Sequence, residues 1–358
     1  MRRILCLDIG AGTMDVLWYD TESVFHYKAV VVSPVRTAAE RAARLPGDLV
    51  VTGCEMGGGP VTAVLRERAA AHRVVMSASA AATLAHDLDK VRGWGIRVVE
   101  DDEAGRLSRK KAFSHLVLED VEPDRIRRIV DAFGVPFEFD AVAVCAQDHG
   151  VPPRGVSHLD FRHRLYRQRL DARPHPHVLL FAAAEVPPVL NRLQSMAATA
   201  ARLPAAEVFV MDSGMAAIVG ASLDAHAPAE APFVVLDVAT SHTVCATVEA
   251  QGLAGVVEYH TVDVTRERLE GLLEGLAAGR LDHAQILAEG GHGAYIRKAV
   301  GPAALETVIA TGPKRRLVLG SRLPVVFGAP LGDNMLTGCA GLLESLRLRK
   351  GMPPLVTV

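Results

Sequence analysis

A unit of strand, aspartate, small-residue turn and second strand occurs twice in this chain of 358 residues. In the first copy, residues 4–19, an apolar run ends at Asp8 and a glycine-rich turn follows. In the second copy, residues 233–248, an apolar run ends at Asp237 and a turn of small and polar residues follows. Identity between the copies is weak, but the shared order of elements predicts a duplicated α/β fold with a cleft between its halves.

Further apolar runs predict additional strands, and helical periodicity predicts helices between them. The predicted strands are residues 48–52, 141–146, 178–181, 208–211, 307–310 and 324–327. The predicted helices are residues 60–71, 123–133, 187–203, 215–223, 265–277 and 334–348. Such alternation is typical of α/β layering. The Ala/Pro-rich residues 225–232 are the predicted linker. Residues 151–176 lack a clear period, so we expect an excursion around the first half.

Charge and cysteine spacing exclude several functional classes. Lys plus Arg number 39 against 41 Asp plus Glu, so no excess of positive charge attracts nucleic acid or an anionic membrane. No apolar run approaches a membrane span, and Asp8 interrupts the N-terminal run too early for a signal peptide, which predicts a cytoplasmic protein. The two nearest cysteines, Cys6 and Cys54, are 48 positions apart, so their spacing predicts no clustered metal-ligand set.

The turn at residues 8–15 has the composition of a phosphate-binding loop. Gly10 and Gly12 permit a tight turn and a close approach to a ligand. Successive amide groups at such a turn, together with the Thr13 hydroxyl, can hold an anion. Asp8 at the strand end can hold Mg²⁺ or its water, because this cation prefers oxygen ligands. The alternative interpretation is a plain glycine-rich hairpin.

Five segments occur in the order found in the ASKHA superfamily, which includes actin, heat-shock chaperones and sugar kinases. Residues 8–15, 211–220, 236–243, 308–315 and 336–343 resemble its first phosphate motif, first connecting helix, second phosphate motif, adenosine strand and second connecting helix, respectively. The resemblance implies two ribonuclease-H-like domains of the actin-like ATPase type with ATP and Mg²⁺ between them. The first domain would be residues 1–228, closed by a C-terminal helix at 335–358, and the second residues 229–334.

The resemblance also implies the nucleotide contacts, with Asp8 and Asp237 orienting Mg²⁺. The implied nucleotide-binding residues are Asp8, Gly10, Ala11, Gly12, Thr13, Asp237, Thr240, Ser241, His242, Thr243, Gly312, Lys314 and Arg315. Residues 314–316 could instead be a solvated charge run. The second phosphate motif lacks the usual glycines, so its backbone can approach phosphate less closely. This departure predicts modest nucleotide affinity, or a second ligand at that loop.

Further features resemble an ASKHA branch sometimes labelled as similar to a pyruvate formate-lyase activating enzyme. They are residues 8–13, the glycines 57–59, residues 147–153 and residues 290–293. The activation chemistry in that label requires a clustered cysteine triad for an iron–sulfur centre, which the cysteine spacing does not predict.

The Gln-Asp-His-Gly segment at residues 147–150 resembles the sugar site of xylulose-kinase-like carbohydrate kinases. The resemblance implies that Gln147 and His149 bind a polar substrate. Asp148, the catalytic candidate together with Asp8, would accept a proton from the attacking hydroxyl. The alternative is a loop that caps the end of a strand.

Two glycine-rich segments are further substrate-binding candidates. Gly58 and Gly59 precede a predicted helix, where free amides can bind an anion; a tight strand–helix connection is the alternative. His292 lies among three glycines in a mobile loop or a simple turn. His149, His242 and His292 could share a metal with Asp148, although their spacing is not a ligand pattern.

These features lead to three functional hypotheses. The first is a kinase that phosphorylates a small polar, sugar-like metabolite with Mg·ATP. The second is a switch ATPase that activates or remodels a partner protein, and the third is a nucleotide-binding filament protein. A small-molecule substrate, a homodimer and a protein partner are the expected alternatives, without nucleic acid or membrane.

Overall fold

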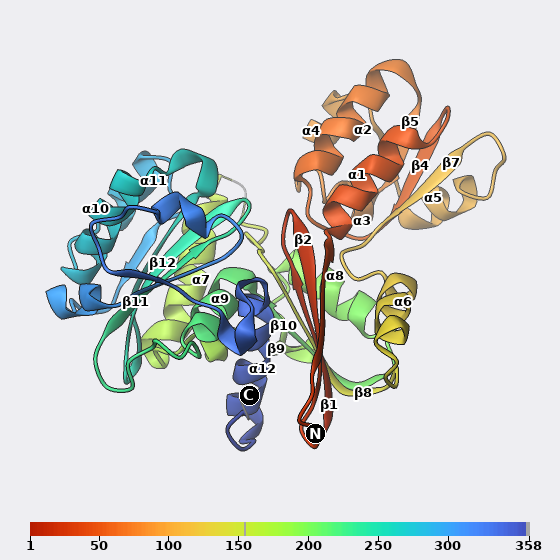
Figure 1. Ribbon diagram of the computed structural model, residues 1–358. Coiled ribbons are helices and arrows are strands. Elements are labelled where there is room, and N and C mark those ends of the chain that lie inside the picture. Colours follow the sequence, from red (N-terminus) through yellow and green to blue (C-terminus); the bar gives the residue numbers. More distant parts are fainter. Residues whose placement is uncertain (154, 356–358) are drawn as a thin grey trace.

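The computed structural model describes residues 1–153 and 155–355. It is a mixed α/β protein with two six-stranded sheets, one four-stranded sheet and helices packed on them (Figure 1). Every helix among the described residues is too short or too polar to cross a bilayer.

The first six-stranded sheet has the order β3-β2-β1-β8-β10-β9. Its strands are β1 (Arg3–Ile9), β2 (Thr13–Asp20), β3 (Tyr27–Val32), β8 (Phe139–Ala146), β9 (Phe181–Ala182) and β10 (Ala205–Asp212). The β1–β2–β3 run is antiparallel, whereas β8 and β10 continue parallel to β1. The central strands β1 and β8 are buried almost throughout, which explains their continuous apolar sequences.

The second six-stranded sheet has the order β14-β13-β12-β11-β15-β16. Its strands are β11 (Phe233–Val238), β12 (His242–Glu249), β13 (Gly252–His260), β14 (Ala294–Ile296), β15 (Val308–Thr311) and β16 (Val325–Phe327). Here too an antiparallel run, β11–β12–β13, is extended by two strands parallel to its first member. The order β13-β12-β11-β15-β16 therefore repeats β3-β2-β1-β8-β10, and both predicted strand–turn–strand units are present.

The four-stranded sheet is an insertion between β3 and β8, with the order β6-β5-β4-β7 and parallel strands. Its strands are β4 (Leu49–Gly53), β5 (Val74–Ser77), β6 (Arg97–Val99) and β7 (Ser114–Leu118). Its helices are α1 (Pro34–Arg44), α2 (Gly59–Ala71), α3 (Ala78–Ala81), α4 (Leu88–Gly93) and α5 (Asp101–Leu107). This unit has its own hydrophobic core and stands apart from the second six-stranded sheet in Figure 1. The strand at 48–52 and the helix at 60–71 were predicted, but the separate sheet was not.

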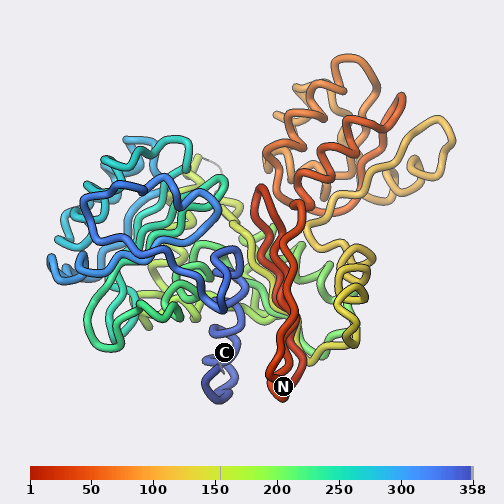
Figure 2. The backbone as a smooth tube through the Cα atoms, viewed as in Figure 1, coloured from red at the N-terminus to blue at the C-terminus, as the bar shows by residue number. Residues whose placement is uncertain are grey.

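The remaining helices surround the two larger sheets. They are α6 (Pro123–Phe133), α7 (His158–Ala172), α8 (Asn191–Ala200), α9 (Ser213–Ala221), α10 (Arg266–Ala277), α11 (His283–Ala288) and α12 (Thr337–Lys350). The C-terminal helix α12 packs beside the N-terminal strand β1 in the middle of the molecule (Figure 2). The helix α12 is shorter than the helix predicted at 335–358, because it ends at Lys350. Residues 356–358 lie outside the described residues.

Helices α9 and α12 cross with their backbones in contact. A Cβ on Gly220 would overlap the carbonyl oxygen of Thr337, and a Cβ on Gly341 would overlap that of Ala216. Glycine is required at both positions because any side chain would separate the helices. The small residues that predicted a connecting helix thus serve close packing.

Three further predicted elements differ from the structure. Residues 178–181 do not form one strand, because Pro176–Leu179 is a 3₁₀ turn and only Phe181 enters β9. The predicted helix at 187–203 begins only at Asn191, after two prolines. The segment without a clear period contains the helix α7, whose buried residues Arg162, Tyr166 and Leu170 recur every fourth position. An arginine in this buried stripe hid the helical pattern.

Candidate functional site

A cavity of about 830 Å³ is lined by residues from both six-stranded sheets and from the inserted unit. The two six-stranded sheets contribute the β1–β2 and β11–β12 loops, the segment after β8 and the turn after β15. The inserted unit contributes the loop after β4 and the segment between α3 and α4. This volume lies within the range of small-molecule sites.

Most of the predicted site residues line this cavity. They are Asp8, Gly10, Ala11, Thr13, Gly58, Gly59, Gln147, Asp148, His149, Asp237, Thr240, Ser241, His242, His292 and Gly312. Among the described residues, four predicted ones lie outside the lining: Gly12, Thr243, Lys314 and Arg315. Cavity residues that were not predicted include Asp15, Glu55, His86, Arg192, Glu258 and His260.

Thr243 and Arg315 are used elsewhere. The Thr243 hydroxyl is buried and lies 3.0 Å from that of Thr261. The Arg315 guanidinium stacks on Phe327 and donates to the carbonyl of Gly328, inside its own half of the protein. Arg315, implied to bind nucleotide, is instead held by residues of its own sheet in this arrangement.

The β1–β2 and β11–β12 loops are the same type of turn. The Gly10 amide donates to the Thr13 carbonyl at 3.0 Å, and the Ala239 amide donates to the His242 carbonyl at 3.0 Å. Each turn begins two residues after the strand aspartate. The second loop therefore reproduces the hydrogen bond of the first turn without its glycines.

The two turns meet at the cavity. A Cβ built on Gly12 would stand 2.9 Å from Oγ1 of Thr240, closer than real Cβ atoms come to their neighbours. Thr240 therefore packs directly against the glycine of the opposite turn. The loops from the two sheets face each other across one shared site.

Asp8 and Asp237 also occupy equivalent positions. Each is held by the residue paired with it on the neighbouring parallel strand. The Cys145 thiol donates to Asp8 Oδ1 at 3.3 Å, and the Thr311 hydroxyl donates to Asp237 Oδ1 at 2.9 Å. Both carboxylates are thus fixed at the strand ends beside the turns.

The carboxylates of Asp8, Asp15 and Asp237 lie near one another and largely shielded from water, and a cation between them would offset their repulsion. Burial raises the pKa of Asp8 to about 7 despite the Cys145 hydrogen bond, and the charge of Asp237 adds to the rise. Burial and then the charge of Asp8 raise the pKa of Asp15 to about 8, and burial raises that of Asp237 to about 6. Oδ1 of Asp15 is buried without a hydrogen-bond partner among the described residues. Clustered carboxylates with an orphaned oxygen fit Mg²⁺.

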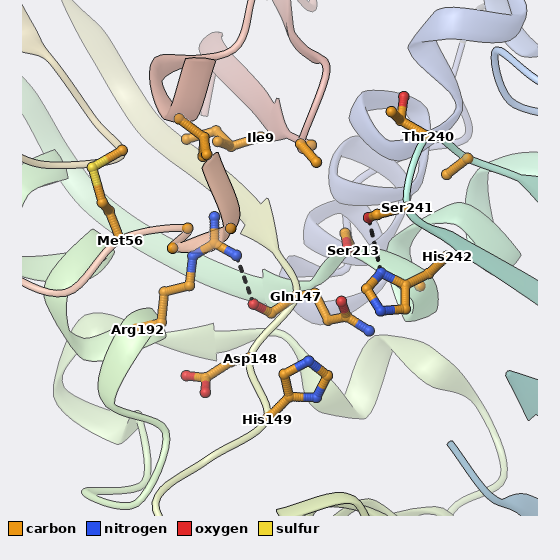
Figure 3. Close-up of a pocket in the computed structure, with 18 of the residues that line it drawn as sticks. Ile9, Met56, Gln147, Asp148, His149, Arg192, Ser213, Thr240, Ser241 and His242 are labelled. Carbon is orange, nitrogen blue, oxygen red and sulfur yellow. Dashed lines mark hydrogen bonds between the residues drawn. The ribbon is translucent and has the colours of Figure 1, made fainter. Parts of the chain in front are cut away.

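Asp148 has a different environment from the one predicted. Its Oδ1 accepts the amide of Gly150 at 2.7 Å, and its Oδ2 accepts the amide of Leu193, in the first turn of α8, at 2.9 Å. Its side chain points away from that of His149 (Figure 3). Because both oxygens are engaged and the residue is 2 % exposed, the structure favours the capping interpretation over proton transfer.

The side chains of Gln147 and His149 differ in whether hydrogen bonds within the protein already engage them. The Gln147 amide donates to Glu258 on β13, so it links the two larger sheets. His149 Nδ1 is buried and has no partner in the part of the chain that the structure describes. Burial and then the charge of Arg162 lower the pKa of His149 to about 3, so this ring is neutral at pH 7. His149 remains the available member of the predicted substrate loop.

A second polar pair lines the cavity on the side of the insertion. His86 Nε2 lies 2.9 Å from Glu55 Oε1, and Asn191 donates to the other oxygen of this carboxylate. The hydrogen bond to Glu55 raises the pKa of His86. The sequence did not reveal this pair because its residues lie on different segments of the inserted unit.

A buried ion pair connects the two larger sheets. Arg162 on α7 donates to Asp212 Oδ2 at 2.8 Å and to Glu258 Oε2 at 2.7 Å. Asp212 ends β10 in the first sheet, and Glu258 belongs to β13 in the second. Although burial opposes it, the charge of Arg162 holds the pKa of Glu258 well below its ordinary value. One arginine therefore joins the sheets beside the cavity.

Three histidines gather at the edge of the second sheet. The ligand atoms of His242, His260 and His292 all lie within 4.8 Å of one another. The predicted metal set was His149, His242 and His292 with Asp148, and it did not include His260. His149 lies nearby, with its ring centre 5.5 Å from that of His292.

Comparison with known proteins identifies the family. Residues 56–317 match the family model described as "Putative pyruvate format-lyase activating enzyme (DUF1786)". The chain belongs to this family. No curated protein matches this DUF1786 chain. Among solved structures, it is similar to the "Crystal structure of apo psk41 parM protein", at 11 % identity and a TM-score of 0.31 over 98 % of each chain.

Proposed function

We propose that this protein binds Mg·ATP in the cavity and transfers the terminal phosphoryl group to a small polar acceptor. The proposal takes the two larger sheets as ribonuclease-H-like domains of an actin-like ATPase, residues 1–228 with the C-terminal helix and residues 229–334. The observation that carries it is the contact of Gly12 with Thr240, which brings two equivalent turns to one cavity.

The residues at the turns suit a triphosphate. Amides at the apex of the first turn and the Thr13 hydroxyl can donate to phosphate oxygens. Asp8 and Asp237 would hold Mg²⁺ from the two strand ends. The chemistry that Mg²⁺ would supply there is neutralisation of the negative charge that develops during phosphoryl transfer. The adenosine would lie near Gly312, whose positive φ and close packing against Val238 shape the turn after β15.

The acceptor would occupy the side of the cavity lined by the insertion. His86, oriented by Glu55, takes the place of Asp148 as the candidate base, because it lines the cavity and an imidazole held by a carboxylate can accept a proton. Arg192 is fixed there by Asp120 and by the carbonyl of Gln147 (Figure 3). His149 and the glycines 57–59 would complete the acceptor site.

A switch ATPase that acts on a partner protein, including a second copy of this chain, is the second candidate. It is favoured by the engagement of Asp148 and Gln147 in internal hydrogen bonds, which removes two expected substrate contacts. The pyruvate formate-lyase activating chemistry in the family description is less favoured, because it requires cysteines that can hold an iron–sulfur centre. Cys6, Cys145 and Cys339 are buried, burial raises the pKa of each thiol, and Cys145 and Cys339 donate internal hydrogen bonds.

Calorimetry and turnover assays test the proposal. We expect ATP to bind in the presence of Mg²⁺, and Asp8→Asn and Asp237→Asn to weaken binding by at least roughly tenfold, about 1.4 kcal/mol. Asp102→Asn, an exposed position, is the control. Unchanged affinity in both cavity variants would refute the site.

Turnover with and without a panel of sugars and polyols separates the two candidates. A kinase requires stimulation by an acceptor and loss of that stimulation in His86→Gln at unchanged ATP affinity. Turnover independent of every acceptor supports the switch ATPase.

A further inference from the structure

We propose that His242, His260 and His292 bind a divalent transition-metal ion at a site separate from the magnesium position at Asp8 and Asp237. All three histidines line the cavity, and their nearest ligand atoms lie within 4.8 Å of one another. The proposal goes beyond the proposed function because it needs neither nucleotide nor acceptor.

The fold brings the three side chains together by strand register. His242 begins β12 and His260 ends β13, and the two residues are paired across this antiparallel ladder. His292 precedes β14, and its amide donates to the Glu258 carbonyl at 2.8 Å. Two paired strands and the segment that leads into a third therefore present the imidazoles together at one end of these strands.

The distances match those between metal ligands. His260 Nε2 and His292 Nε2 are 3.1 Å apart. Two nitrogens bound tetrahedrally at the usual zinc distance of about 2.0–2.1 Å are separated by about 3.3 Å. A hydrogen bond between the His260 and His292 rings would also explain the short distance between these two nitrogens. It leaves His242 Nε2 unexplained, because that atom is buried and has no partner among the described residues.

Neighbouring polar groups lie behind two of the rings. Ser241 Oγ lies 2.9 Å from His242 Nδ1, which leaves Nε2 of this ring available (Figure 3). Glu258, whose other oxygen is held by Arg162, places Oε1 3.5 Å from His292 Nδ1, which is a charge contact and too long for a hydrogen bond. A carboxylate behind a histidine ligand is a common arrangement in metal sites, because it fixes the tautomer and the ring orientation.

The donor set indicates the class of ion. Imidazole nitrogens suit Zn²⁺, Co²⁺, Ni²⁺ or Fe²⁺, whereas Mg²⁺ prefers the carboxylates across the cavity. Three protein ligands leave a coordination position for water or a ligand, as in catalytic zinc sites. Because all three residues line the cavity, that position would face the proposed substrate site.

Titration with metal alone tests the site. We propose to strip the full-length protein with a chelator and titrate it, without nucleotide, with Zn²⁺ by calorimetry and with Co²⁺ by visible absorption. The expected result is one Zn²⁺ per chain and the intense visible bands of four-coordinate Co²⁺. The absence of stoichiometric Zn²⁺ binding, or the weak spectrum of six-coordinate Co²⁺, would overturn the proposal.

Variants locate the bound metal. His260→Ala and His292→Ala should each weaken Zn²⁺ binding by more than roughly 100-fold, since even changes behind the ligands cost 10- to 100-fold. His72→Ala, an exposed histidine after α2, is the matched control. His260 is exposed at a strand end, so its variant should fold, which circular dichroism checks. Wild-type affinity in both site variants would overturn the proposal. ATP affinity is measured separately in His260→Ala. Weaker Zn²⁺ binding at unchanged ATP affinity distinguishes this site from the nucleotide site.

Discussion

The backbone of Gly338, in the first turn of α12, lies directly against the carboxylate of Asp8 at the end of β1. A Cβ on Gly338 would overlap both the carboxylate carbon and Oδ2. The two residues are separated by almost the whole chain, so the C-terminal helix fixes a carboxylate of the N-terminal turn. The position of Asp8 therefore depends on a contact that only glycine permits.

Gly338→Ala should displace the Asp8 carboxylate and weaken Mg·ATP binding. We expect a loss of at least roughly tenfold in affinity, about 1.4 kcal/mol, measured by calorimetry at saturating Mg²⁺. Gly105→Ala is the control, because this glycine of α5 has open space where its Cβ would be. Equal affinity of the Gly338 variant and the wild type would contradict the role given to this contact.

Asp148→Asn separates a capping role from a catalytic one. The substitution leaves one of two buried amide donors without an acceptor, which should cost about 1–3 kcal/mol in the free energy of unfolding. The control is Asp282→Asn at the start of α11, where asparagine caps nearly as well as aspartate. Nucleotide turnover should persist in the folded Asp148 variant. A loss of turnover of 100-fold at unchanged stability would instead restore Asp148 as a catalytic residue.

Arg162→Met should be strongly destabilising. It leaves the carboxylates of Asp212 and Glu258 buried without their cation, and removing one partner of such a pair costs about 3–5 kcal/mol. Tyr166→Phe removes only the hydroxyl that donates to Asp212 at 3.1 Å, and should cost about 1 kcal/mol. Denaturant unfolding of both variants checks the ranking. Similar values for the two would mean that the arginine is not the main link between the sheets.

His163 should make stability fall at acid pH. Its ring stacks on that of His283 at 3.8 Å between centres, and burial, followed by the charge of His283, lowers the pKa of His163 to about 4. The unfolded chain, with a pKa near 6.5, then binds more protons than the folded one. The contribution of the neutral His163 ring to the free energy of unfolding is complete above pH 6.5 and is lost as the pH falls toward 4.

His163→Phe keeps a stacked ring that cannot titrate. In thermal or denaturant unfolding, the wild type should lose stability relative to this variant between pH 6.5 and 4, with a constant difference above pH 6.5. A difference that does not change with pH would show that His163 titrates normally in the folded protein.

The sequence predicted the central strands and both turns because their signals are local. Apolar runs of buried parallel strands, an aspartate at the strand end and small residues at the turn all lie within a few positions, as at residues 4–15. The inserted four-stranded sheet was missed because its short strands resemble those of the main sheet. Nothing local tells which sheet a strand such as residues 48–52 will join.

The site was harder to predict where partners are distant in sequence. Asp148 follows a buried strand, as a catalytic residue could, but its second amide donor is Leu193 on another element. His260 was missed because the β12–β13 hairpin was not predicted, and only the register of that hairpin places it opposite His242. Glu258 lies two residues earlier on the same strand. Pairing the predicted strand at residues 243–248 with the strand that follows it would have revealed both.

Where α9 crosses α12, main chain faces main chain at Gly220 and Gly341. Side chains that interlock between helices resist rotation, because each must leave its groove before the helices can turn. At these two glycines no side chains are present to interlock. The main chain alone therefore sets how near the two helix axes come at this crossing.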